Sequence, residues 1–284
     1  MRKDVIHEIN SGLQTAFIDS SYNSNLAYRP QFITNDHKRG VKVLTHIENE
    51  LLHCDEFSIS VAFINRSGFV ELSETLKELE QRGIKGRILT TDYLCFSDPY
   101  ALDRLAALSN VDLKMYHVDD AGVGFHTKGY LFKESGIYRI IIGSSNMTQT
   151  ALSTNMEWNT QLVSTEQGEM AQSIVNEFEK LWEDEASIKY DEFIEAYRDK
   201  YNRKKQIDRL VREQHKIAIQ EEIVNYDAYK LRPNKMQEEF ICNIHDLIER
   251  GAKKALLISA TGERGIFVTG GRNPVFTRVL EAWS

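Results

Sequence analysis

The sequence lacks several features that would assign it to a class at once. Its 284 residues contain no apolar run of about 18 residues, the length that a membrane-spanning helix needs. The residues from Met1 to Val5 soon become polar and lack the apolar core of a signal peptide. The 3 cysteines are far apart, odd in number and without metal-ligand spacing. We therefore expect no membrane span, no disulfide framework, no bound metal and a reducing, cytoplasmic location.

The composition is that of an ordinary globular protein. It is 42% hydrophobic and 27% charged, with only 4 prolines and 16 glycines, which excludes collagen-like, low-complexity and wholly disordered chains. The length predicts one or two domains. The net charge of −7 argues against nucleic-acid binding over the whole surface. A local positive patch would still suffice to bind phosphate, so nucleic acid remains a possible partner.

Helical and strand-like patterns alternate along the first two thirds of the chain. This alternation predicts an α/β (α+β) fold with a mixed β-sheet flanked by helices. A polar run at residues 183–185 places the first domain boundary near residue 186. The helical patterns cover residues 43–52, 69–81, 99–108 and 170–182, and the strand patterns cover 57–63, 86–91, 112–117, 128–132, 138–142 and 157–163.

Residues 187–228 contain almost no turn residues and predict a helical linker after the domain of residues 1–186. Four cations recur in it at helical spacing and would share one face. This face is either a solvated helix surface or a stripe that follows the phosphates of a nucleic acid. The four cations are Lys205, Arg209, Arg212 and Lys216.

The most informative residues lie in two neighbouring strand patterns. His126 and Lys128 are two positions apart at the start of one, so their side chains would point to the same face. Ser144 and Asn146 have the same spacing at the end of the next. If the two strands form a hairpin, an imidazole, an ammonium, a hydroxyl and an amide meet at one place. The alternative is a sheet edge with incidental polar residues.

This set of side chains suits a phosphodiester. An ammonium supplies a point charge, and hydroxyl and amide groups supply directed donors to the non-bridging oxygens. Imidazole can attack phosphorus to form a covalent intermediate, and it transfers protons near neutral pH. The residues therefore predict phosphoryl transfer, which depends mainly on positioning and charge stabilisation.

The segment from His126 to Trp158 resembles the phospholipase D superfamily, whose signature is His-x-Lys followed by Gly-Ser-x-Asn. It looks most like the nuclease-type domain at the N-terminus of certain bacterial DEAD/DEAH-box helicases, and the resemblance covers roughly residues 40–185. It implies a phospholipase D-like fold and a cofactor-free phosphodiesterase. In bacterial nucleases of this superfamily a glutamate at about the position of Glu157 orients the catalytic histidine. One departure is Lys133, which stands where the signature has an aspartate.

The sequence contains the signature once, whereas the mechanism of the superfamily uses two histidines. Small nucleases with a single copy pair as two-fold dimers, so the resemblance implies a homodimer with His126 of each subunit in a shared site. The leading hypothesis is a metal-independent DNA endonuclease, with RNA as the alternative nucleic acid. The rival hypotheses are a nucleic-acid-binding or docking module without turnover, and a lipid-processing member of the superfamily.

Other candidates are weaker. Tyr93 and Phe96 follow a strand pattern and either line a substrate groove or pack a loop. His117 ends a strand pattern and reads as structural. His46 and His53 could share a helix face, but no Cys, Asp or Glu at suitable spacing makes a zinc site with them.

Residues 229–284 resemble the start of a superfamily-two helicase followed by an unrelated tail. An Arg-Pro element at Arg232 precedes an apolar strand pattern at 255–259 that leads into Thr261-Gly262. Glu263 and Arg264 follow in place of the Gly-Lys-Thr/Ser of a phosphate loop. We therefore expect a truncated or frame-shifted helicase that does not bind ATP, and a strand that needs another element to pair with.

Overall fold

The computed structural model describes residues 3–225, 250, 254–257 and 266–269, and it describes the side chains of the long helix α8 as far as Val211. The chain divides into two compact units, Met1–Val211 and Arg212–Ser284. The first unit contains every predicted catalytic residue.

The first unit is built on one eight-stranded mixed sheet, in the order β1-β7-β6-β5-β2-β3-β4-β8. β2, β3 and β4 run parallel, and all other neighbours are antiparallel. This confirms the predicted mixed sheet. The strands are β1 (Gln31–Ile33), β2 (Glu56–Val61), β3 (Lys85–Thr91), β4 (Val111–Tyr116), β5 (Lys128–Glu134), β6 (Ile137–Gly143), β7 (Asn159–Thr165) and β8 (Ser187–Lys189).

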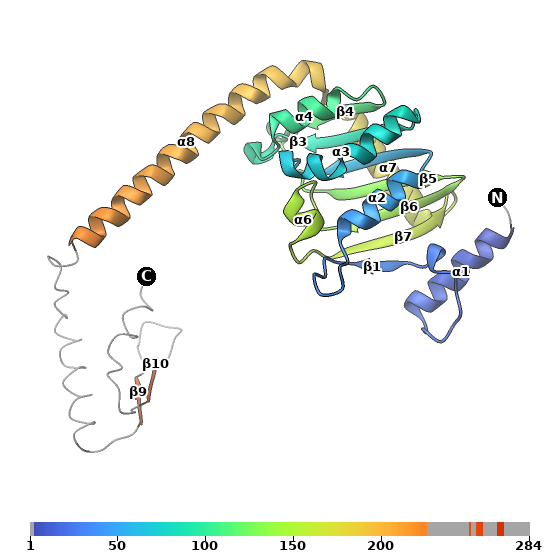
Figure 1. The fold of residues 1–284 in the computed structure, drawn as a ribbon, viewed down its shortest axis with the longest axis horizontal. Helices are drawn as coiled ribbons and strands as arrows, with labels where there is room; N and C mark the ends of the chain where they lie inside the picture. Colours follow the sequence, from blue (N-terminus) through green and yellow to red (C-terminus); the bar gives the residue numbers. More distant parts are fainter. Residues whose placement is uncertain (1–2, 226–249, 251–253, 258–265, 270–284) are drawn as a thin grey trace. The chain divides into compact units, whose positions relative to one another are not determined.

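Helices cover both faces of the sheet, as predicted (Figure 1). α2 and α3 pack on one face, where Ile47, Leu72 and Leu76 meet Ile59 of β2 in the larger core cluster. α7 packs on the other face. The helices and 3-10 turns are α1 (Lys3–Phe17), η1 (Leu26–Tyr28), α2 (Val43–His53), α3 (Arg66–Gln81), η2 (Tyr93–Cys95), α4 (Pro99–Ala106), α5 (Val118–Ala121), α6 (Gln149–Ser153), α7 (Glu169–Glu183) and α8 (Tyr190–Asn225).

Local sequence signals account for the ends of these elements. The side chain of Asn65 caps α3 by accepting a hydrogen bond from the backbone N–H of Gly68 at 2.7 Å. Pro99 stands in the first turn of α4, where its missing N–H costs nothing. The β5–β6 hairpin turns through Ser135 and Gly136, both with positive φ. The two strands that carry the signature are therefore joined by a tight turn and form a hairpin.

The residues that follow position 186 contribute to the sheet and the core of the first unit. β8 pairs with β4, and the first turns of α8 bury Phe193, Ile194 and Tyr197. The hydroxyl of Tyr197 donates to the carbonyl of Ser97 at 2.7 Å. The part of α8 up to Val211 thus belongs to the first compact unit, while the helix itself covers most of the span predicted as helical.

In the second unit, β9 (Lys254–Leu257) pairs antiparallel with β10 (Ile266–Thr269). The strand expected at 255–259 therefore has a partner, which lies near the end of the chain. The Arg-Pro element, the departure from the phosphate loop and most of the tail lie outside the described residues.

None of the described helices has the length and apolar character to cross a membrane.

The close contact of α3 with the segment after β6 gives a stability prediction. A Cβ atom added to Gly68 would lie 2.1 Å from the carbonyl oxygen of Met147. Because backbone must move to relieve this overlap, Gly68→Ala should lower the free energy of unfolding by about 2 kcal/mol. Gly124→Ala is the control, since nothing lies within 4 Å of its added Cβ. Chemical denaturation measures both, and equal stabilities would contradict the close packing.

Candidate active site

The five predicted catalytic residues lie at one end of the sheet. Lys128 is the first residue of β5, and His126 lies two residues before it. Ser144 and Asn146 follow the last residue of β6, and Glu157 precedes β7. β5, β6 and β7 are successive antiparallel neighbours. The start of β5, the end of β6 and the start of β7 therefore lie side by side at the same end of the strands (Figure 1).

His126 is exposed, whereas Lys128 is buried. The imidazole of His126 lies edge-on to the ring of Phe63, with 6.1 Å between ring centroids. Lys128 is 8% exposed, and its Nζ donates to the backbone carbonyl of His126 at 2.8 Å. Burial lowers the pKa of Lys128, and the negative charge of Glu157 acts in the opposite direction. The site therefore holds a partly desolvated cation next to an accessible imidazole.

Glu157 contacts Ser144 in this structure. The hydroxyl of Ser144 donates to the Oε2 atom of Glu157, and its Oγ atom accepts the backbone N–H of Trp158 at 3.1 Å. Both hydrogen bonds tie the end of β6 to the start of β7. The orientation of His126 by Glu157, which the resemblance implies, stays a prediction.

The amide of Asn146 is fixed by the segment that follows β2. Its Oδ1 atom accepts the backbone N–H of Phe63 at 3.1 Å. The Nδ2 group is consequently the end of this side chain that can donate to a ligand. A parallel bridge between Ile64 and Met147 holds the two segments together. Phe63 thus contacts both His126 and Asn146, a role that the strand pattern in the sequence did not reveal.

Ser145 and Asn159 form the buried support of the site. The Oδ1 atom of Asn159 accepts the backbone N–H of Ser145 at 3.3 Å, and its Nδ2 group donates to the Ser145 hydroxyl at 2.9 Å. Tyr130 is 1% exposed, and its hydroxyl donates to the Ser145 carbonyl at 3.0 Å. Sequence reasoning missed these residues because Ser145 stands at the unspecified position of Gly-Ser-x-Asn. The available signal was the two-residue spacing between Glu157 and Asn159, which places both side chains on the same face of the predicted strand.

Lys133, the departure from the signature, lies toward the far end of β5 from Lys128. Its Nζ atom is 3.1 Å from Glu166 and 3.5 Å from Glu56. The side chain of Glu134 pairs instead with Arg139 at 3.1 Å. At about 3.3 Å per residue, five strand positions separate Lys133 from Lys128 by roughly 17 Å. The substituted position therefore takes part in a surface ion pair away from the phosphate-binding groups.

The predicted substrate-binding residues lie on η2 and α8. Tyr93 is 41% exposed on η2. Lys205 places its Nζ atom 4.6 Å from the ring centroid of Tyr201, and Arg209 is exposed on the same helix. Arg212 and Lys216 belong to α8, but their side chains lie outside the described residues. None of the described contacts of Lys205 joins it to the catalytic residues.

Two histidines away from the site, His117 and His46, are only partly exposed. His117 is mostly buried, with Nδ1 3.5 Å from Asp92. Burial would raise the pKa of Asp92, but hydrogen bonds from His117, the Val118 backbone and Lys200 lower it well below its usual value. Burial also lowers the pKa of His46. Within the described part of the chain, no three His, Cys, Asp or Glu side chains are grouped to hold a metal ion.

Comparison with known families gives a match over the part of the chain that carries this site. Residues 52–182 match the family described as "Cardiolipin synthase, PLD-like domain", where PLD denotes phospholipase D. Two curated relatives are named mitochondrial cardiolipin hydrolase. The mouse protein is 26% identical over 45% of this chain and 53% of its own length, and the zebrafish protein is 30% identical over 42% and 50%. The chain thus spans about half the length of these relatives.

Solved structures of low sequence identity were also matched. One is Nuc from Salmonella typhimurium, a phospholipase D family member, with 14% identity and a TM-score of 0.45. It is covered over 99% of its length and covers 57% of this chain, and NucT from Helicobacter pylori gives the same values.

The support of the signature loop by Asn159 can be tested by substitution. Asn159→Ala removes both hydrogen bonds to Ser145 and leaves a buried N–H unpaired, so it should cost about 2 kcal/mol of stability. Thr160→Ala, at the exposed neighbouring position, should change stability by less than about 0.5 kcal/mol. Thermal unfolding followed by circular dichroism compares the two, and the interpretation is wrong if they are equally stable.

Proposed function

From a phospholipase D-like domain over residues 52–182, we propose a phosphodiesterase that hydrolyses DNA without a metal ion. The observation that carries the proposal is the placement of His126, Lys128, Ser144 and Asn146 at one end of the sheet. Imidazole, ammonium, hydroxyl and amide together supply a nucleophile and donors for the phosphate oxygens.

In the proposed mechanism the imidazole of His126 attacks phosphorus in line with the leaving oxygen. A bond from phosphorus to nitrogen forms, and the bond from phosphorus to the leaving oxygen breaks. A second histidine donates a proton to that oxygen. It then takes a proton from water as the water attacks the phosphohistidine, which breaks the bond from phosphorus to nitrogen and frees His126. Lys128 and the Nδ2 group of Asn146 hold the non-bridging oxygens, because their charge and orientation suit them. Ser144 joins them once its hydroxyl turns from Glu157, which then orients the imidazole.

The second histidine in this proposal is His126 of another copy of the chain. The sequence contains the signature once, so one subunit supplies one histidine. Large apolar side chains are exposed near Ser144 and Glu157: Trp158 is 73% exposed, Met156 92% and Phe32 63%. Phe32 and Trp158 contact each other edge-on at 5.8 Å. We propose that the second copy covers them in a two-fold dimer.

DNA is proposed as the substrate because two resemblances agree. The domain resembles the nuclease domains of certain bacterial helicases, and residues 229–284 resemble the start of a helicase. A second candidate is an anionic phospholipid, favoured by the name of the mouse and zebrafish relatives. Both substrates contain the phosphodiester that the site suits, so the cleavage test includes both.

The activity itself gives the first test of this function. The full chain should cleave single- and double-stranded DNA in EDTA, and His126→Asn should lower the rate on the order of a thousandfold because it removes the nucleophile. His7→Asn, at an exposed position on α1, is the matched control and should cleave as the wild type does. Cardiolipin vesicles serve as the second substrate. Cleavage of DNA that survives His126→Asn would remove the mechanism, and cleavage of cardiolipin alone would favour the lipid.

Mixing wild-type and His126→Asn chains tests the shared site. If each site needs two copies of His126, a mixed dimer is inactive, so activity should follow the square of the wild-type fraction. An equal mixture, after subunit exchange, should retain about a quarter of the activity rather than about half. Activity proportional to the wild-type fraction, or a monomer in sedimentation analysis, would contradict the shared site.

A further inference from the structure

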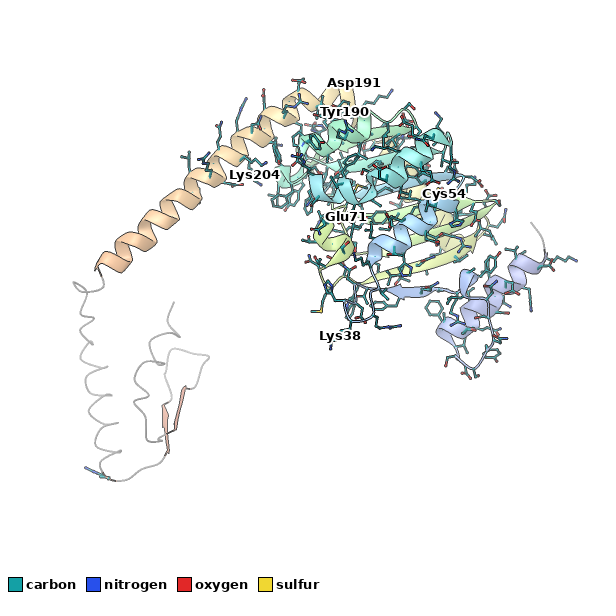
Figure 2. The ribbon with its side chains drawn as sticks, in the orientation of Figure 1. Lys38, Cys54, Glu71, Tyr190, Asp191 and Lys204 are labelled. Carbon is teal, nitrogen blue, oxygen red and sulfur yellow. The ribbon has the colours of Figure 1, made fainter. Side chains whose placement is uncertain are left out.

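An open cleft of about 800 Å³ lies between η2 and the first half of α8. Tyr93 and Leu94 of η2 line one side, and Lys200, Arg203, Lys204 and Ile207 line the other. Lys204 is labelled on α8 in Figure 2. Its ammonium donates to the carbonyl of Leu94, so a direct hydrogen bond joins the two walls.

The backbone of η2 is held in an unfavourable conformation. Leu94 and Cys95 have φ values of 54° and 48°, in the left-handed region that costs about 1–3 kcal/mol for a residue other than glycine. Hydrogen bonds hold the turn, from the Cys95 N–H to the Asp92 carbonyl and from the Tyr93 N–H to the Thr91 hydroxyl. Tyr93 and Leu94 remain 41% and 47% exposed, so this turn presents large side chains to solvent.

The opposite wall of the cleft is mainly basic. Lys200, Arg203 and Lys204 are spaced to share one side of α8. Asp92 and Asp199 also line the cleft, and Asp92 is paired with Lys200 at 3.0 Å. With Lys200 paired to Asp92, two cations, Arg203 and Lys204, remain against the single carboxylate of Asp199. The wall attracts an anionic ligand.

A series of aromatic rings connects this basic wall with the catalytic histidine. The Nζ atom of Lys204 lies 4.5 Å from the ring centroid of Phe96. Phe96 is 49% exposed and contacts Phe63 edge-on at 5.0 Å. Phe63 in turn contacts His126. Phe96 and Phe63 thus form a run of ring contacts from Lys204 in the cleft to the candidate active site.

We propose that this cleft binds a single-stranded stretch of nucleic acid that leads into the active site. Its bases would stack on Tyr93 and Phe96, and its phosphates would lie along Arg203 and Lys204. The proposal rests on the proposed nuclease function and names the substrate form. Exposed rings next to cations suit the bases and phosphates of a single strand. The cations are distinct from the predicted stripe of Lys205, Arg209, Arg212 and Lys216.

The test is a binding titration with the full chain carrying His126→Asn, so that DNA is not cut. A fluorescently labelled single strand of about 20 nucleotides is followed by anisotropy in EDTA at several salt concentrations. Tyr93→Ala should weaken binding about tenfold because one stacked base is lost. Arg203→Ala should reduce the slope of log affinity against log salt by about 0.7, the value for one lost phosphate contact on a single strand.

The matched controls are Tyr22→Ala and Lys180→Ala, at exposed positions in the turn after α1 and on α7. Both should bind as the parent does, and circular dichroism verifies that all variants fold. If Tyr93→Ala and Arg203→Ala bind like the controls, the cleft is not the strand-binding site. If they lose affinity for vesicles of anionic phospholipid and keep affinity for DNA, the occupant is a lipid and the proposal is overturned.

Binding and cleavage separate this inference from the proposed function. Cleft-dependent binding by a chain that never cuts DNA would support the inference and refute the nuclease. Cleavage that depends on His126, with binding indifferent to Tyr93 and Arg203, would support the nuclease and refute the inference.

Discussion

The arrangement of this site depends on how the segment after β6 is held. Residues 144–147 leave the sheet and are fastened on two sides. Asn159 of β7 binds Ser145 on one side, and the segment after β2 binds Asn146 and Met147 on the other. Without these hydrogen bonds, the hydroxyl and amide of the signature would have no fixed position relative to Lys128. The positions of Ser144 and Asn146 therefore depend on hydrogen bonds to the start of β7 and to the segment after β2, which is distant in sequence.

Burial partly removes water from the ammonium group of Lys128. Lys128 is enclosed at the start of β5, where the carbonyl of His126 accepts one of its hydrogen bonds and the carboxylate of Glu157 adds a negative charge. A partly desolvated ammonium interacts more strongly with a phosphate than one in water. The same enclosure leaves His126 at the surface, beside Phe63, where a substrate can reach it. The buried Lys128 and the exposed His126 thus lie together at the start of β5.

The first half of α8 extends the domain beyond the family match. Its buried residues Phe193 and Tyr197 anchor it to the core, and its basic residues face η2 across the cleft. The family match ends at residue 182, so this wall lies outside the matched residues.

The sequence by itself predicted the candidate catalytic residues and determined most of the helices and strands. Alternation identified the strands from Phe57 to Val163, and two-residue spacing put His126 with Lys128, because both signals depend only on neighbours in the chain. Tertiary structure decided what depends on distant residues. It paired Glu157 with Ser144, turned the Asn146 amide and brought Lys204 to Leu94. Such contacts join residues that are far apart in the chain. They produce no regular spacing in the sequence, so only the folded structure shows them.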